Sequence, residues 1–261
     1  MIKTAFVTVL STDSYLPGVL VLHSSLMKTG TQHPFLTLLT RDISQHTKGV
    51  LEWYKIPYEV MNMEITNPHE GVPTDDPWYY TYAKIGIFGL SRFDKIVYLD
   101  ADMLVLHNLD ELFEKPHMSA VNAGGRLPEN SAWIEMNSGL MVIEPSTALL
   151  QDMLQRIGKI EQEKKEKDYS DQGFLQCYYP DWPSRDDLHL SHAYNMFDRY
   201  VERYHHLFGF WVEGLHAPEK ESIKIIHYIG KVKPWNEDPG DEDNDWTRTR
   251  RMWIEEFTSL I

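Results

Sequence analysis

Short apolar runs alternate with helical patterns along the first sixty residues. The runs 4–10, 35–40 and 58–63 have the length of buried strands, and the segments between them place apolar side chains at helical spacing. Three such runs separated by two helices are typical of a parallel sheet that is buried on both faces. The pattern therefore predicts that the chain opens as strand, helix, strand, helix, strand in an α/β fold.

The pattern is less regular in the rest of the chain. Residues 64–78 contain three prolines and a glycine and are predicted to form a loop. Residues 177–218 show no clear period. Elsewhere we expect helices at 79–90, 146–160 and 247–260, and strands at 95–99, 139–143 and 222–228.

Charge and cysteine content narrow the classes of function. The chain has 25 basic and 39 acidic residues, a net charge of −14, and such a surface repels nucleic acids and anionic membranes. Cys177 is the single cysteine, so no internal disulfide can form. No signal-peptide pattern and no apolar run long enough for a transmembrane segment are found. We therefore expect a cytoplasmic protein.

Two carboxylates follow the strongest of the predicted strands. Asp100 and Asp102 come directly after 95–99, where parallel sheets bind ligands, and alternate residues of an extended segment point the same way. The pair can hold a hard divalent cation that bridges a diphosphate. A solvated turn or a helix cap explains the same residues. Position separates this pair from Asp243 and Asp245, which lie in a plainly acidic loop.

A second predicted strand end carries the segment His-Tyr-Ile-Gly-Lys-Val-Lys-Pro-Trp at 227–235. His227 can bind a metal through a neutral imidazole. Gly230 lets the backbone approach a phosphate closely, and Lys233 can neutralise that phosphate. An ordinary strand-to-turn connection, with a packed histidine and a surface lysine, is the alternative.

Three further segments, 9–15, 137–139 and 168–173, combine polar side chains with turn or cap positions. The first can line a nucleoside pocket beside the first strand, and the other two can contact sugar hydroxyls. Core packing, a simple turn and a helix cap explain them as well.

The order and spacing of these segments resemble the family 8 glycosyltransferases, with the glycogenin-like and galactinol-synthase-like group nearest in pattern. The resemblance spans nearly the whole chain up to Trp235. It rests on Ser-Thr-Asp-Ser-Tyr at 11–15, Tyr-Ala-Lys at 82–84, Tyr-Leu-Asp-Ala-Asp at 98–102, Asn-Ser-Gly at 137–139, Asp-Gln-Gly at 171–173 and the segment 227–235.

The resemblance implies a GT-A type, Rossmann-like fold that binds a nucleotide sugar on a mostly parallel central sheet. We expect a single glycosyltransferase domain over 1–261. Its predicted parts are a nucleotide-binding half at 1–110, a sugar and acceptor half at 111–235, and an acidic loop with a C-terminal helix at 236–261. Family members often form dimers, and a homodimer is compatible with the resemblance.

The resemblance also implies residue roles in a Mn²⁺-dependent enzyme with a UDP-sugar donor. Asp100, Asp102 and His227 would hold the metal. The donor would be contacted by these three and by Val9, Ser11, Thr12, Tyr15, Lys84, Ala101, Asn137, Ser138, Asp168, Asp171, Gln172, Gly230 and Lys233. The candidates for catalysis are Asp171, Gln172 and Lys233.

The implied reaction is transfer of a hexose, with retention at the anomeric carbon, to a sugar, polyol or glycan. UDP-glucose and UDP-galactose are the expected donors, with UDP-N-acetylglucosamine as a third. The metal and Lys233 would stabilise charge on the leaving UDP. Asp171 is the candidate for a covalent nucleophile. The alternative, which we favour, is attack from the same face with the leaving phosphate taking the acceptor's proton.

Other functions compete with this interpretation. A glycogenin-type self-glucosylating protein needs an acceptor tyrosine, but the position counted from Tyr194-Asn195 holds Glu202. A catalytically inactive UDP-sugar or carbohydrate-binding protein on the same scaffold is a second alternative, although it has no need of the complete metal and lysine set. A nucleotidyltransferase is disfavoured because 9–15 contains neither glycine nor a basic residue.

Overall fold

The structure is a computed structural model that describes residues 2–68, 79–160, 170–240 and 242–260. Contacts divide the chain into two compact units. The first unit comprises Met1–Asp13, His33–Leu99 and Leu112–Leu190, and the second comprises Ser14–Gln32, Asp100–Glu111 and Ser191–Ile261. The expected single domain over 1–261, with its parts at 1–110, 111–235 and 236–261, stays a prediction.

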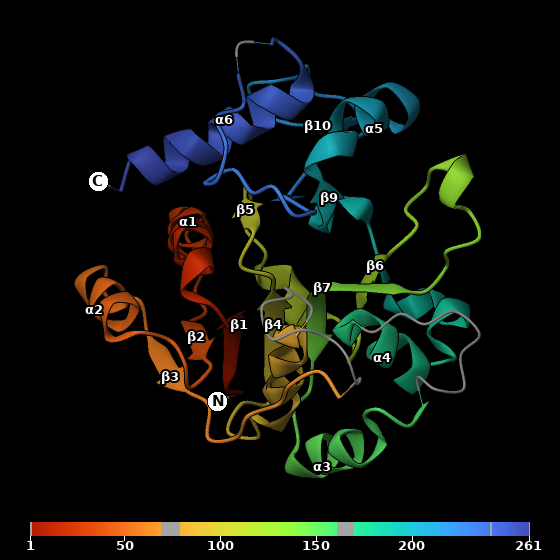
Figure 1. The fold of residues 1–261 in the computed structure, drawn as a ribbon. Helices are drawn as coiled ribbons and strands as arrows, with labels where there is room; N and C mark the ends of the chain where they lie inside the picture. Colours follow the sequence, from red (N-terminus) through yellow and green to blue (C-terminus); the bar gives the residue numbers. More distant parts are fainter. Residues whose placement is uncertain (1, 69–78, 161–169, 241, 261) are drawn as a thin grey trace. The chain divides into compact units, whose positions relative to one another are not determined.

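The first unit is built on a seven-stranded sheet with the strand order β3-β2-β1-β4-β7-β6-β8 (Figure 1). In this order the strands are Tyr58–Val60, Phe35–Leu39, Thr4–Leu10, Lys95–Leu99, Met136–Ile143, Ala120–Asn122 and His189–Leu190. Four of the six pairings are parallel, and the two that involve β7 are antiparallel. The α/β fold with a mostly parallel sheet is confirmed.

The direction of β7 departs from the parallel pattern that opens the chain. A parallel neighbour needs a crossover connection, which is usually a helix. Between β4 and β7 the chain forms only short strands and 3₁₀ turns, so β7 returns beside β4 in the opposite direction. The apolar pattern alone predicts a buried strand here but not its direction.

The described residues of the first unit form the α-helices α2 at Gln45–Trp53, α3 at Thr147–Arg156 and α4 at Asp171–Tyr178. Each follows a serine whose hydroxyl accepts a hydrogen bond from a backbone N–H of the first turn. The helical pattern at 79–90 forms the 3₁₀ helix Thr81–Gly89. Both α3 and α4 pack on this 3₁₀ helix, and α4 also packs on β7.

One row of register partners lies in the apolar core of the first unit. Val7 of β1 pairs with Tyr98 of β4, which pairs with Met141 of β7, so their side chains lie on one face of the sheet. Phe174 of α4 joins the same cluster, and all four side chains are buried. Each fully buried side chain of this size contributes about 1.5–3 kcal/mol, so this row stabilises the pairing of β1, β4 and β7.

The second unit has two small sheets. The three-stranded sheet has the order β5-β12-β9, and β10 pairs with β11. Their bounds are Met103–Val105, Ile225–His227, Met196–Phe197, Phe210–Trp211 and Glu221–Ser222. The apolar run at 222–228 therefore contributes to two short strands.

Three α-helices complete the second unit: α1 at Leu16–Lys28, α5 at Val201–Phe208 and α6 at Asp245–Thr258. The helix α1 packs on β5 and on α6 (Figure 1). Asn244 and Thr247 form a capping box, which explains why α6 starts slightly before the expected position. No helix in the described part of the chain is long and apolar enough to cross a membrane.

Candidate functional site

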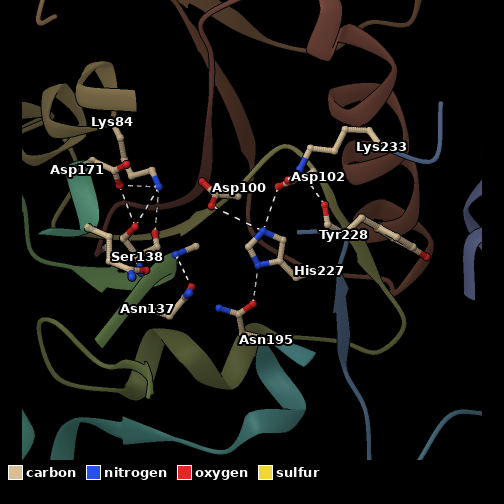
Figure 2. Close-up of polar contacts among 12 residues, drawn as sticks. Lys84, Asp100, Asp102, Asn137, Ser138, Asp171, Asn195, His227, Tyr228 and Lys233 are labelled. Atoms are coloured by element: carbon tan, nitrogen blue, oxygen red, sulfur yellow. Dashed lines mark hydrogen bonds and ion pairs between the residues drawn. The ribbon is translucent and has the colours of Figure 1, made fainter. Parts of the chain in front are cut away.

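The second unit brings Asp100, Asp102 and His227 together (Figure 2). The two aspartates precede β5, and His227 ends β12, which pairs antiparallel with β5 so that His227 lies opposite Met103. Candidate ligand atoms of the three side chains lie within 4.8 Å of one another. His227 Nε2 is 3.1 Å from Asp102 Oδ1 and 3.8 Å from Asp100 Oδ2.

Asn195 orients the imidazole of His227. Its Oδ1 lies 2.7 Å from His227 Nδ1, and both residues are buried. Asn195 stands just before β9, whose Phe197 pairs with His227 in a parallel ladder. When Nδ1–H donates to this amide oxygen, the lone pair of Nε2 faces the carboxylates, as in a histidine that binds a metal.

Lys233 completes the charged cluster. Its Nζ lies 2.5 Å from Asp102 Oδ2 and 2.8 Å from the Tyr228 carbonyl oxygen. Burial alone would raise the pKa of Asp102, but the charge of His227, when the ring is protonated, and the charge of Lys233 hold that pKa below its usual value, together with their hydrogen bonds. Burial alone would lower the pKa of Lys233, and the attraction of Asp102 and the neighbouring Tyr15 raises it instead. The lysine therefore stays protonated.

The donor set fits a divalent cation. Two carboxylates and one ammonium leave this cluster with an excess negative charge when His227 is neutral. Carboxylate oxygens and an imidazole nitrogen suit Mn²⁺ and similar ions. Within the described residues, this is the one group of three or more acidic, histidine or cysteine side chains placed close enough to share an ion.

The loop after β12 contains Gly230 at φ +94°, where other residues are strained. A Cβ at this position would also lie 2.8 Å from Arg199 Nη2, and the same nitrogen donates to the Ile229 carbonyl oxygen over 3.2 Å. Glycine is thus required here by backbone conformation. Further along, the Trp235 ring packs edge-on against Tyr15, with 5.4 Å between ring centroids.

Ala101, between the two aspartates, is buried and lies against α1. A Cβ built on Gly18 of α1 would come within 2.4 Å of the Ala101 carbonyl oxygen and 3.0 Å of the Trp235 ring. Glycine at position 18 therefore allows the helix to contact the backbone of the Asp-Ala-Asp turn.

The first unit holds a separate polar cluster around Lys84 (Figure 2). Lys84, on the 3₁₀ helix, forms an ion pair of 2.9 Å with Asp171 Oδ2, at the first turn of α4. The same oxygen accepts a hydrogen bond of 2.8 Å from Ser138 Oγ of β7. Gln172 Oε1 accepts from the Ser138 N–H, and Asn137 Oδ1 accepts from the Gly139 N–H.

The remaining predicted residues are placed as follows. Val9 and Ser11 lie at the carboxyl end of β1, and the Ser11 carbonyl oxygen accepts a hydrogen bond from Thr40 Oγ1. Thr12 follows and is half-buried. Asp168 lies outside the described residues.

Sequence reasoning missed Asn195, Gly18 and Tyr228 as parts of the site. The Tyr194-Asn195 pair served only to locate the acceptor position of a glycogenin-type protein. Asn195 lies in a segment with no clear hydrophobic period, so the sequence does not indicate that its side chain contacts His227. Gly18 sits inside a helical pattern, where an isolated glycine is a weak hint of close backbone contact.

The residues described above lie within a region that matches a known family. The sequence model of glycosyl transferase family 8 matches residues 6–238. The chain belongs to glycosyl transferase family 8. All predicted site residues fall within the match, whereas α6 lies beyond it.

Two curated relatives illustrate the range of this family. Glycogenin-1 of Homo sapiens is 31% identical over 242 residues, which cover 90% of this chain and 63% of that protein. Inositol phosphorylceramide glucuronosyltransferase 1 of Arabidopsis thaliana is 30% identical over 246 residues, which cover 90% of this chain and 43% of that protein. This family 8 chain thus spans less than two thirds of the length of either relative.

A solved structure of an active-site mutant of LgtC shares the fold. It aligns with a TM-score of 0.70 at 17% sequence identity, over 98% of this chain and 95% of that one. The expected GT-A type fold is confirmed by this likeness.

Proposed function

We propose that this chain transfers a hexose from a UDP-sugar to a sugar, polyol or glycan acceptor, with retention and with Mn²⁺ as cofactor. The observation that carries the proposal is the group of half-buried Asp100 with buried Asp102 and His227, and with Lys233 bound to Asp102, in a family 8 chain. UDP-glucose and UDP-galactose are the first donors to test. The name of the Arabidopsis relative, a glucuronosyltransferase, adds a glucuronosyl donor to the panel.

Asp100, Asp102 and His227 would hold the metal, and Asn195 would keep His227 Nε2 available to it. A divalent cation supplies positive charge next to a diphosphate. Lys233 adds a buried, protonated ammonium, so it can stabilise the negative charge that develops on a leaving nucleoside diphosphate. Lys233 is therefore the proposed catalytic residue in the second unit.

Asp171 is proposed to bind hydroxyls of the donor sugar. Its Oδ2 already accepts from Ser138 and pairs with Lys84, and both contacts reduce the electron density available for nucleophilic attack. This favours same-face transfer, in which the leaving phosphate oxygen takes the proton of the acceptor hydroxyl as the new glycosidic bond forms. Gln172, Asn137 and Asp168 are proposed to share the sugar contacts.

A self-glucosylating function receives no support from the contacts of α5. Glu202 is exposed and offers a carboxylate, and Tyr204 is buried, which withholds its hydroxyl from a donor. Mass spectrometry of the protein after incubation with donor checks this point directly. A hexose attached to Tyr200 or Tyr204 would reverse the preference.

The test of the proposed function is UDP release from a panel of UDP-sugars, measured with Mn²⁺ and with chelator. We expect release from one donor, abolished by chelator and reduced at least about 100-fold in Asp102→Asn. Asp243→Asn is the matched control, because it makes the same substitution in the exposed acidic loop, where Asp243 pairs with Arg248. Mn²⁺-dependent UDP binding without turnover, for every donor and acceptor supplied, would favour an inactive binding protein.

A further inference from the structure

The helix α6 contacts the loop that carries Lys233 at two points of the segment 228–233. Tyr228 opens the loop, and its hydroxyl donates to the Thr249 carbonyl oxygen of α6 over 2.6 Å. The backbone of Tyr228 takes part in the charged cluster: its N–H donates to the Asp102 carbonyl oxygen over 2.9 Å, and its own carbonyl oxygen accepts from Lys233. A shift of Tyr228 would therefore move Lys233.

Arg250 of α6 makes the second of these contacts. Its Nη2 donates to the Val232 carbonyl oxygen over 3.0 Å, one residue before Lys233. Arg250 is 2% exposed; its guanidinium lies over the Trp246 ring at 4.3 Å, and Nη2 stands 3.4 Å from Asp198 Oδ2. Burial and three kinds of contact fix this arginine more firmly than a surface side chain.

The loop has little structure of its own. It contains Gly230 at φ +94°, and no strand or helix is assigned between β12 and α6 in the described residues. Glycine permits many backbone conformations. A segment that contains it therefore needs contacts with other elements to hold it in a single conformation. The contacts with α6 at Tyr228 and Val232 supply that constraint.

We propose that Arg250 is a positioning residue for the donor site, acting through Lys233. It holds the Val232 carbonyl oxygen, and so sets the place of the Lys233 ammonium before a diphosphate binds. The inference rests on the proposed function and goes beyond it, because α6 lies outside the region that matches the family. Preorganised charge binds and stabilises a leaving group better than mobile charge.

Three variants separate this role from simple stabilisation. Arg250→Met removes the hydrogen bond and the charge, and Arg250→Lys keeps the charge. Arg251→Met is the matched control on the same helix, since Arg251 donates to the carbonyl oxygens of Gly240 and Glu242, which lie beyond the segment 228–233 that carries Lys233. If Arg250→Met does not fold because Asp198 is left as a buried charge, Asp198→Asn/Arg250→Met removes both charges and takes its place.

The measurement is calorimetric titration with Mn²⁺ alone and with UDP at saturating Mn²⁺. We expect Arg250→Met to weaken UDP binding about 10- to 100-fold with unchanged Mn²⁺ affinity. Arg250→Lys should recover part of the loss, and Arg251→Met should match the wild type. In a Lys233→Met background, Arg250→Met should weaken UDP no further. An equal additional loss in that background, or a parallel loss of Mn²⁺ affinity, would overturn the proposal.

Hydrogen exchange tests the loop without any ligand. We expect the amides of residues 229–233 to exchange faster in Arg250→Met than in Arg251→Met, with exchange in the first unit unchanged. Equal exchange in the two variants would count against the positioning role. If the wild type binds no UDP in the presence of Mn²⁺, the proposed function fails, and this exchange result still decides whether Arg250 orders the loop.

Discussion

Each unit buries a lysine–aspartate pair, but the two pairs stand in different charge settings. Lys84 and Asp171 in the first unit balance each other, and Ser138 occupies the same carboxylate oxygen. In the second unit, Lys233 pairs with Asp102, while Asp100 adds another carboxylate beside His227. The first cluster holds one carboxylate and one ammonium group, and the second holds one carboxylate more than it holds ammonium groups.

This difference indicates what each cluster can do. A buried charge is costly unless it is paired and hydrogen-bonded. The pair in the first unit meets that condition within the protein, so it is suited to hold a rigid set of polar groups for neutral hydroxyls. The cluster in the second unit groups two carboxylates with an imidazole, a set of ligand atoms that suits a divalent cation.

The largest effect is expected from breaking the balanced pair. Lys84→Met leaves Asp171 as an unpaired buried carboxylate, which should lower the free energy of unfolding by about 3–5 kcal/mol. Lys84→Met/Asp171→Asn removes both charges and should recover most of the loss. Urea denaturation measures the free energy of unfolding of both variants. Added Mn²⁺ should not raise this free energy in either variant.

Lys95→Met is the control for this experiment. Lys95 pairs with Glu144 over 3.3 Å at a partly exposed position of the same unit, and we expect a loss of about 0–1 kcal/mol. A loss for Lys84→Met no larger than for Lys95→Met would show that the buried pair contributes no more than a surface pair.

An intermediate effect is expected at the histidine of the unbalanced cluster. Asn195→Leu removes the acceptor for His227 Nδ1–H, so the imidazole loses its fixed orientation. Mn²⁺ affinity should fall about 10- to 100-fold. Asn195→Asp keeps an oxygen in place and should preserve binding. Calorimetric titration with Mn²⁺ checks both variants, and an unchanged affinity in Asn195→Leu would exclude the orienting role.

The smallest effect concerns the backbone under the candidate metal site. Gly18→Ala places a Cβ 2.4 Å from the Ala101 carbonyl oxygen, which should cost about 1–3 kcal/mol of stability. The displaced Asp100–Asp102 turn should also bind Mn²⁺ more weakly. Gly49→Ala in α2 is the matched control, because a Cβ there meets nothing within 4 Å; it should stabilise the protein by about 0.4–1 kcal/mol. Thermal unfolding that shifts equally in both variants would contradict the close contact.

Much of the first unit could be predicted from local pattern. The runs at 4–10, 35–40 and 95–99 are nearly continuous in apolar residues, and they form β1, β2 and β4 of one parallel set. A strand that is buried on both faces has apolar side chains at consecutive positions, so it can be recognised from the sequence alone. The family also followed from the sequence, because several short polar segments keep a fixed order along the chain.

Local pattern could not predict the direction of β7 in the sheet. It also could not predict which site residues contact one another, or which contacts α6 makes. His227 and Asp102 are 125 positions apart, and their contact depends on the antiparallel register of β12 with β5. Two short strands carry too little pattern to specify that register.

The sequence by itself therefore determined the fold class, the family and the residue types available for a metal and a diphosphate. Tertiary structure decided which of those residues meet, that Asn195 orients His227, and that Arg250 reaches the Lys233 loop. The physical reason is that buried positions are mostly occupied by apolar residues, so burial can be inferred from residue type at each position. A hydrogen bond between distant residues depends instead on how whole elements pack, and no single residue type encodes that arrangement.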